Sequence, residues 1–127
     1  MNTSEILNKA ADLIEEQEGW TSGSGWPGEA EYGGSETGGL CLEGGIMAAL
    51  GIKFGQRWDD TFKTCPAVHA VNAYLERPAG HALYGWNDMP GRTADEVVEV
   101  LRAAAVIEAA REEQDAAWAT YAEQVSA

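Results

Sequence analysis

One cysteine stands where the sequence could support nucleophilic chemistry. Cys41 follows a glycine-rich stretch and opens a predicted helix, and a helix N-terminus can stabilise a thiolate through its backbone N–H groups and its dipole. His69 or His81 would then act as the base, with Asp88 or Asn87 orienting it. The competing interpretation is a buried thiol, because free cysteine packs as a small hydrophobic residue. We favour this structural role and treat these residues as weak catalytic candidates.

Other catalytic and cofactor signatures are missing from the sequence. It contains no phosphate-binding Gly-x-x-x-x-Gly-Lys loop, no Gly-x-Ser-x-Gly turn and no His-Glu-x-x-His helix. Two histidines are too few for a metal site without carboxylates, and the acidic residues do not follow any spaced ligand motif such as a calcium-binding loop. We therefore expect no metal and no cofactor.

Aromatic residues and glycines are interleaved from Gly19 to Gly39, where eight of 21 residues are glycine. Glycines let the backbone approach a ligand closely, but they also make turns around rings that fill a core. We favour the packing role. A small-ligand pocket, the alternative, would be lined by Trp20, Trp26, Tyr32 and Trp86.

The most specific local pattern is the stretch from Trp86 to Glu96. Asp88 is placed to close a Pro-Gly turn, and Thr93 followed three residues later by Glu96 is a capping box, which marks the start of a helix. We expect Arg92 to pair with a nearby carboxylate. Asp88 and Arg92 could also bind a ligand beside Trp86, but the turn and the cap account for most of these residues without one.

The spacing of apolar residues predicts a mainly α fold: a compact bundle of about four helices, a Gly-rich loop with room for a short β-hairpin, and a long C-terminal helix. The expected helices cover residues 4–18, 40–50, 64–75 and 94–127, with Gly19 ending the first and Pro66 in the first turn of the third. The first would be capped by Ser4 or Thr3. Gly44 and Gly45 cost the second about 1 kcal/mol each in helix propensity, so we expect them to permit a tight helix crossing.

Residues 1–105 are predicted to form a single globular α-helical domain, and residues 106–127 a helical extension. Neither Gly nor Pro occurs beyond residue 93, so one helix of about 33 residues is allowed, and its apolar stripe changes face near Glu108. The extension could fold back there, or project and pair with another copy. We favour self-association into a homo-oligomer. Its interface would contain Trp118, Tyr121 and Val125.

The net charge of −13 is the strongest compositional signal. It makes direct binding to nucleic acid or to an anionic membrane unfavourable and favours a basic partner protein. No apolar run reaches 18 residues and the first twenty residues are acidic, so we expect a cytoplasmic protein without a membrane span. Cys41 and Cys65 are too few for a disulfide framework, and we expect both to be thiols.

Three motifs follow one another along the chain: Ala10-Ala11-Asp12-Leu13-Ile14 before Gly19-Trp20, Cys41-x-x-Gly44 opening a helix, and Trp86-Asn87-Asp88-Met89-Pro90-Gly91-Arg92-Thr93. Together they resemble a family of small uncharacterised domains of actinobacteria and their phages, over about residues 5–105. That family has no assigned activity, so the resemblance implies fold and origin rather than function. Relatives tend to have Leu and Ala at the positions of Glu43 and Gly45, and residues 106–127 look like an addition.

These observations favour a small acidic binding module without enzymatic activity. It would act on a basic host protein, as an inhibitor or as a mimic of nucleic acid, and mimicry requires its carboxylates to form one stripe. One alternative is a hydrolase or transferase that depends on Cys41. The other is a small-ligand-binding protein that uses the aromatic Gly-rich segment.

Overall fold

The computed structural model describes residues 1–22, 39–52 and 63–126. The elements are α1 (Thr3–Asp12), the π-helix η1 (Leu13–Glu18), α2 (Leu42–Ala49), α3 (Pro66–Tyr74), α4 (Tyr84–Asn87) and α5 (Ala94–Ser126). No strand occurs in these described ranges, where Trp20 and Leu40 form an isolated parallel bridge. The predicted mainly α fold with a long C-terminal helix is confirmed. The β-hairpin predicted in the Gly-rich segment lies outside the described residues.

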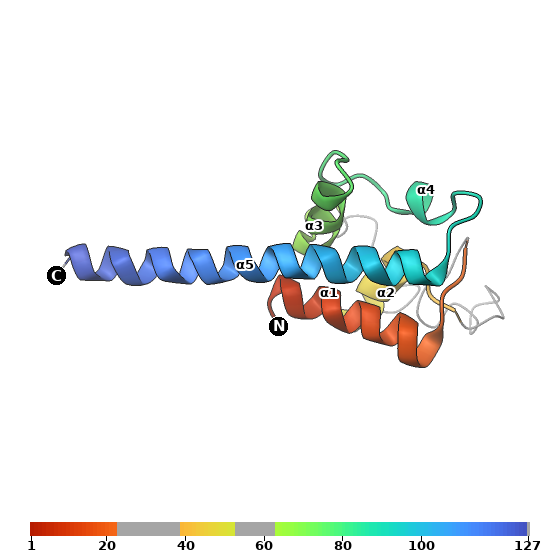
Figure 1. Ribbon diagram of the computed structural model, residues 1–127, viewed down its shortest axis with the longest axis horizontal. Coiled ribbons are helices and arrows are strands. Elements are labelled where there is room, and N and C mark those ends of the chain that lie inside the picture. Colours follow the sequence, from red (N-terminus) through yellow and green to blue (C-terminus); the bar gives the residue numbers. More distant parts are fainter. Residues whose placement is uncertain (23–38, 53–62, 127) are drawn as a thin grey trace.

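The long helix α5 is the axis of the molecule (Figure 1). α1 lies along one side of its N-terminal half, α3 packs against it from another side, and α2 packs against α1. One apolar core joins these helices. Each of them contributes fully buried residues, among them Leu7, Ile46, Val68, Val71, Val97 and Leu101. The C-terminal part of α5 extends well beyond this packed part.

The start of α1 differs from the prediction. Asn2 is the N-cap, and its Oδ1 accepts a hydrogen bond from Glu5 N at 2.9 Å, whereas Ser4 and Thr3 lie inside the helix. The Ser4 N–H and hydroxyl instead lie 3.1 and 2.8 Å from the two carboxylate oxygens of Glu112 on α5. A carboxylate from α5 therefore occupies the positive end of the α1 dipole and ties the two helices together.

The predicted tight helix crossing is confirmed at Gly45. A Cβ atom at this position would lie 2.7 Å from Ile14 Cδ1 and 3.5 Å from the Ala10 carbonyl oxygen. Ile14 and Ala10 are themselves buried at 2% and 0% exposure. The missing side chain thus lets α2 approach the α1–η1 helix closely enough to exclude water from this contact.

The other predicted helix ends follow local signals. Helical structure before Gly19 ends where this glycine adopts a φ of 77°, which is the left-handed region that favours glycine at helix ends. α3 begins with Pro66 in its first turn, as predicted. α5 runs from Ala94 to Ser126 without interruption, so the extension projects and does not fold back near Glu108.

We expect Gly45→Ala to lower the free energy of unfolding by about 1 kcal/mol. Overpacking a core costs about 1–3 kcal/mol, and the gain in helix propensity returns about 1 kcal/mol. Urea denaturation of Gly45→Ala in the wild-type and Ile14→Val backgrounds measures the effect. Ile14→Val removes the atom at 2.7 Å, so the same substitution should become neutral or stabilising there, and an equal loss in both backgrounds would contradict the close contact.

Candidate functional site

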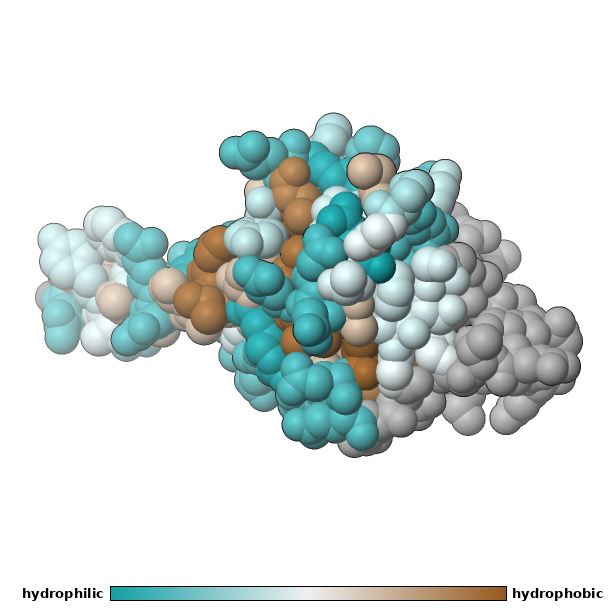
Figure 2. All heavy atoms as spheres, turned by 45° about the vertical axis from the view of Figure 1, so that its right-hand side comes forward, coloured by the Kyte–Doolittle hydropathy of each residue, from teal (hydrophilic) through white to brown (hydrophobic). Residues whose placement is uncertain are grey.

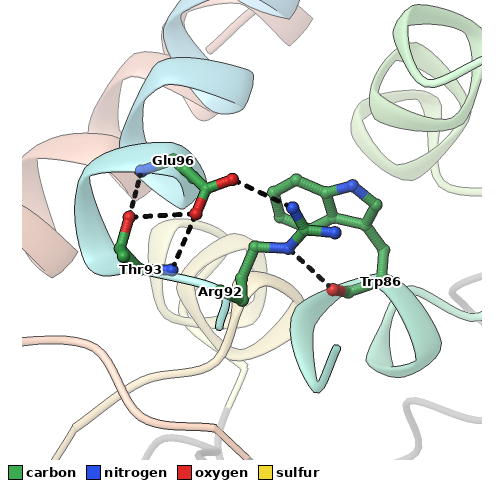
Figure 3. Close-up of polar contacts among 4 residues, drawn as sticks. All are labelled: Trp86, Arg92, Thr93 and Glu96. Atoms are coloured by element: carbon green, nitrogen blue, oxygen red, sulfur yellow. Dashed lines mark hydrogen bonds and ion pairs between the residues drawn. The ribbon is translucent and has the colours of Figure 1, made fainter. Parts of the chain in front are cut away.

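Residues 86–96, which we call the joint, connect α4 to α5 and set the direction in which α5 leaves α4. The turn is closed by a hydrogen bond from Arg92 N to Met89 O at 3.0 Å, with Gly91 at a φ of 85°. The Arg92 guanidinium carbon lies 3.6 Å from the centroid of the Trp86 ring, and Arg92 Nε donates to Trp86 O at 3.0 Å (Figure 3). This cation–π contact fixes the position of the Arg92 side chain, which faces the first turn of α5.

The predicted capping box is confirmed (Figure 3). Glu96 N donates to Thr93 Oγ1 at 3.2 Å, and Thr93 N donates to Glu96 Oε1 at 3.1 Å. The expected carboxylate partner of Arg92 is the same Glu96, at 3.1 Å. The hydrogen bond from Arg92 is the main cause that lowers the pKa of Glu96, and the bonds from Thr93 lower it further. The side chains of Arg92, Thr93 and Glu96 therefore all have a structural role.

Asn87 is the centre of a buried polar network that connects three segments. Its side chain is 1% exposed. Its Oδ1 accepts from Trp20 Nε1 at 2.7 Å and from Leu42 N at 3.0 Å, while its Nδ2 donates to Thr21 O at 3.2 Å and to Asp88 Oδ1 at 2.9 Å. This one amide holds α4, the N-terminus of α2 and the segment after η1 together.

Sequence reasoning considered Asn87 only as an orienter for a catalytic base. Three of its four hydrogen-bond partners are 45 to 67 residues away in the chain. The local signal is a lone Asn between Trp86 and Asp88, which does not identify a buried amide.

Cys41 occupies the N-cap position of α2. It is 4% exposed, and its Sγ accepts a hydrogen bond from Gly44 N at 3.2 Å. The His69 ring is hydrogen-bonded to Lys63 O at 2.6 Å, and His81 contributes its main-chain oxygen to Asn72. In the described part of the chain, neither histidine is hydrogen-bonded to Cys41. This geometry supports the capping role and not a thiol–imidazole pair.

Only part of the proposed aromatic pocket lies in the described structure. Trp20 is half-buried and is held by Asn87, and Trp86 is half-buried beneath Arg92. Trp26 and Tyr32 lie outside the described residues. The rings of Trp20 and Trp86 are thus each engaged in a packing or hydrogen-bonding contact.

Residues 106–126 of α5, which we call the arm, present several uncovered apolar side chains. Every residue from 113 to 126 is exposed. Hydrophobic residues gather at the base of the arm (Figure 2). The exposed fractions are 70% for Val106, 54% for Ile107, 63% for Trp118, 54% for Tyr121 and 63% for Val125. Apolar side chains this uncovered on a projecting helix make the arm the best candidate for an interaction site.

Two other site types are not assembled in the residues that the structure describes. Within them, no three His, Cys, Asp or Glu side chains are grouped so that they could hold a metal ion. None of the described helices combines the length and the apolar character needed to cross a membrane.

Replacing Asn87 with Leu should destabilise the protein by about 3 kcal/mol, because the Leu42 N–H and the Trp20 indole N–H would lose their acceptor. Asn72→Leu is the matched control. Asn72 is equally buried, but its Oδ1 has no partner among the described residues and its Nδ2 makes one bond, to His81 O. It should cost about 1 kcal/mol or less. Equal losses in chemical denaturation would refute the assigned role of Asn87.

The Glu96 contacts predict a pH dependence of stability. Because the pKa of Glu96 is lowered in the folded state from its ordinary value of 4.5, its ionised form stabilises the fold above that value. The contribution is lost as the pH falls through the lowered pKa. The stability difference between wild type and Glu96→Gln should therefore be present at pH 7 and vanish in strong acid, whereas Glu99→Gln controls for removal of an exposed carboxylate. A difference that persists unchanged at low pH would contradict this.

Comparison with known proteins places this architecture in a family. A search of curated proteins and a search of solved structures found no match. Residues 1–107 match the model described as a family of unknown function, DUF6197. The match includes the Gly45 crossing, the Asn87 network and the Trp86–Glu96 joint, and it ends near the base of the arm. The chain therefore belongs to the DUF6197 family of unknown function.

Proposed function

We propose that this protein is a non-enzymatic binding module that uses its acidic arm to bind a basic protein of an actinobacterial host. The resemblance noted in the sequence suggests an origin in a phage or an actinobacterium. The observation that carries the proposal is the charge of the projecting arm, where five acidic residues stand against Arg111 alone. Binding would then modulate the host protein, for example by inhibiting it.

The acidic side chains of the arm are not evenly distributed. Glu108, Glu112, Asp115 and Glu123 are spaced four, three and eight residues apart, which places them on one side of a helix with 3.6 residues per turn. Glu108 is ion-paired with Arg111, and Glu112 caps α1. Asp115 and Glu123 are exposed, so they are the carboxylates best placed to meet a partner.

A nucleic-acid-binding protein is one class of basic partner that suits this arrangement. Its lysine and arginine side chains are spaced to neutralise a row of phosphates. Carboxylates along one side of a helix would stand in for those phosphates. The net charge of −13 would also speed the encounter with such a protein at low salt.

Affinity capture from an actinobacterial lysate tests the proposal. Wild type should retain a basic protein at 0.1 M salt and release it at 1 M, where the screening length falls from about 10 Å to about 3 Å. Asp115→Asn/Glu123→Gln should retain about three- to tenfold less of the same protein, since exposed charges contribute a fraction of a kcal/mol each.

The control variant is Glu76→Gln/Glu99→Gln. It removes the same charge from exposed positions outside the arm and should retain the partner as wild type does. Capture of no basic protein at low salt, or an equal loss in both variants, would overturn the proposal.

A further inference from the structure

The apolar side of the arm carries holes that can receive side chains of another helix. A groove of about 300 Å³ is lined by Gln114, Ala117, Trp118 and Tyr121. These residues stand at positions i, i+3, i+4 and i+7 along the helix. Four residues with this spacing enclose the hole in knobs-into-holes packing between helices, so the groove has the form that a helical partner fills.

A second groove continues the first toward the packed part of the molecule. It measures about 690 Å³ and is lined by Ile107, Ala110, Arg111, Glu113, Gln114 and Ala117. It contains two further sets with the same spacing, one beginning at Ile107 and one beginning at Ala110. Ala110 and Ala117 leave these holes open for large side chains.

The same side of the arm also carries the knobs. Ile107, Trp118, Tyr121 and Val125 are each more than half exposed. The Trp118 and Tyr121 rings meet edge to face, with centroids 5.6 Å apart and planes at 81°. This contact orients both rings before any partner arrives. Because holes and knobs share one side, the surface is complementary to a copy of itself.

The order of large and small residues selects an antiparallel pairing. When two arms are aligned in opposite directions so that Ile107 of one copy faces Gln124 of the other, Tyr121 of one copy faces Ala110 of the other. Trp118 of one copy then faces the hole that Ala110, Glu113, Gln114 and Ala117 of the other copy enclose. Gln114 of one copy faces Ala117 of the other. A parallel pairing would stack Tyr121 on Tyr121 and Ala117 on Ala117, which leaves some layers crowded and others empty.

Charges on the flanks agree with the antiparallel register. Arg111 of one copy lies next to Trp118 of the other, where a cation–π contact is favourable. Glu113 lies next to Thr120 of the other copy and so avoids a second Glu113. The acids that share one side of the arm, among them Asp115 and Glu123, stay outside the contact.

We propose that two copies of this protein form an antiparallel homodimer through residues 106–126, with their packed parts at opposite ends. The pairing uses the apolar side of the arm and leaves the acidic side exposed, so it is independent of the proposed binding to a basic protein. Since each chain carries a net charge of −13, salt should strengthen the dimer. It should weaken the binding of a basic partner.

Analytical ultracentrifugation of the full chain tests the dimer. Wild type should approach twice the chain mass of 13.6 kDa as concentration rises to about 1 mM, with tighter association at 1 M than at 0.1 M salt. Tyr121→Glu should weaken dimerisation at least about tenfold. Tyr84→Glu, which alters a tyrosine that is 65% exposed on α4, should leave it unchanged. A wild-type monomer throughout, or equal effects of the two substitutions, would overturn the proposal.

Disulfide trapping tests the direction of pairing. Ile107→Cys and Gln124→Cys chains are mixed and oxidised, while the natural Cys41 and Cys65 are buried at 4% and 6% exposure. Antiparallel arms should give a cross-link between position 107 of one copy and position 124 of the other. Cross-links of 107 to 107, or none between the two variants, would overturn the antiparallel register.

Discussion

One constraint determines the rest of this molecule: the helix α5 is longer than the packed part of the structure that supports it. The 33 residues of α5 span about 50 Å at the standard rise, yet its buried residues run only from Val97 to Ala105. α1 accompanies it as far as the contact between Ser4 and Glu112. Beyond that contact α5 has no neighbour among the described residues, so its exposed surface results directly from the difference in length.

The direction of that helix is set by polar contacts around its first turn. Arg92 stacks on Trp86 and bonds Glu96, and Asn87 joins α4 to α2 and to the segment after η1. The same network bonds Leu42 N, at the start of the helix that Cys41 caps. A thiol buried in this way stabilises a helix end. The packed part of the molecule thus serves as a rigid base from which the arm extends.

The features that the sequence predicted correctly are those encoded within a few residues. The Thr93–Glu96 box, Pro66 at the start of α3, Gly45 at a close crossing and the unbroken run after residue 93 all have local physical causes. The prediction of Ser4 or Thr3 as N-cap was wrong, because the partner of Ser4 lies 108 residues away on α5. Asn87 was missed for the same reason: a polar network between distant segments leaves no local pattern.

Hydrogen exchange as a function of protein concentration tests most directly whether the arm is an interaction element. The backbone hydrogen bonds of an uncovered helical arm open easily, so its amide hydrogens exchange quickly, whereas pairing with another helix protects them from exchange. We predict that protection of residues 113–126 rises with concentration while protection of α1 and of residues 97–105 stays constant. Protection of the arm that is the same at every concentration would contradict the account.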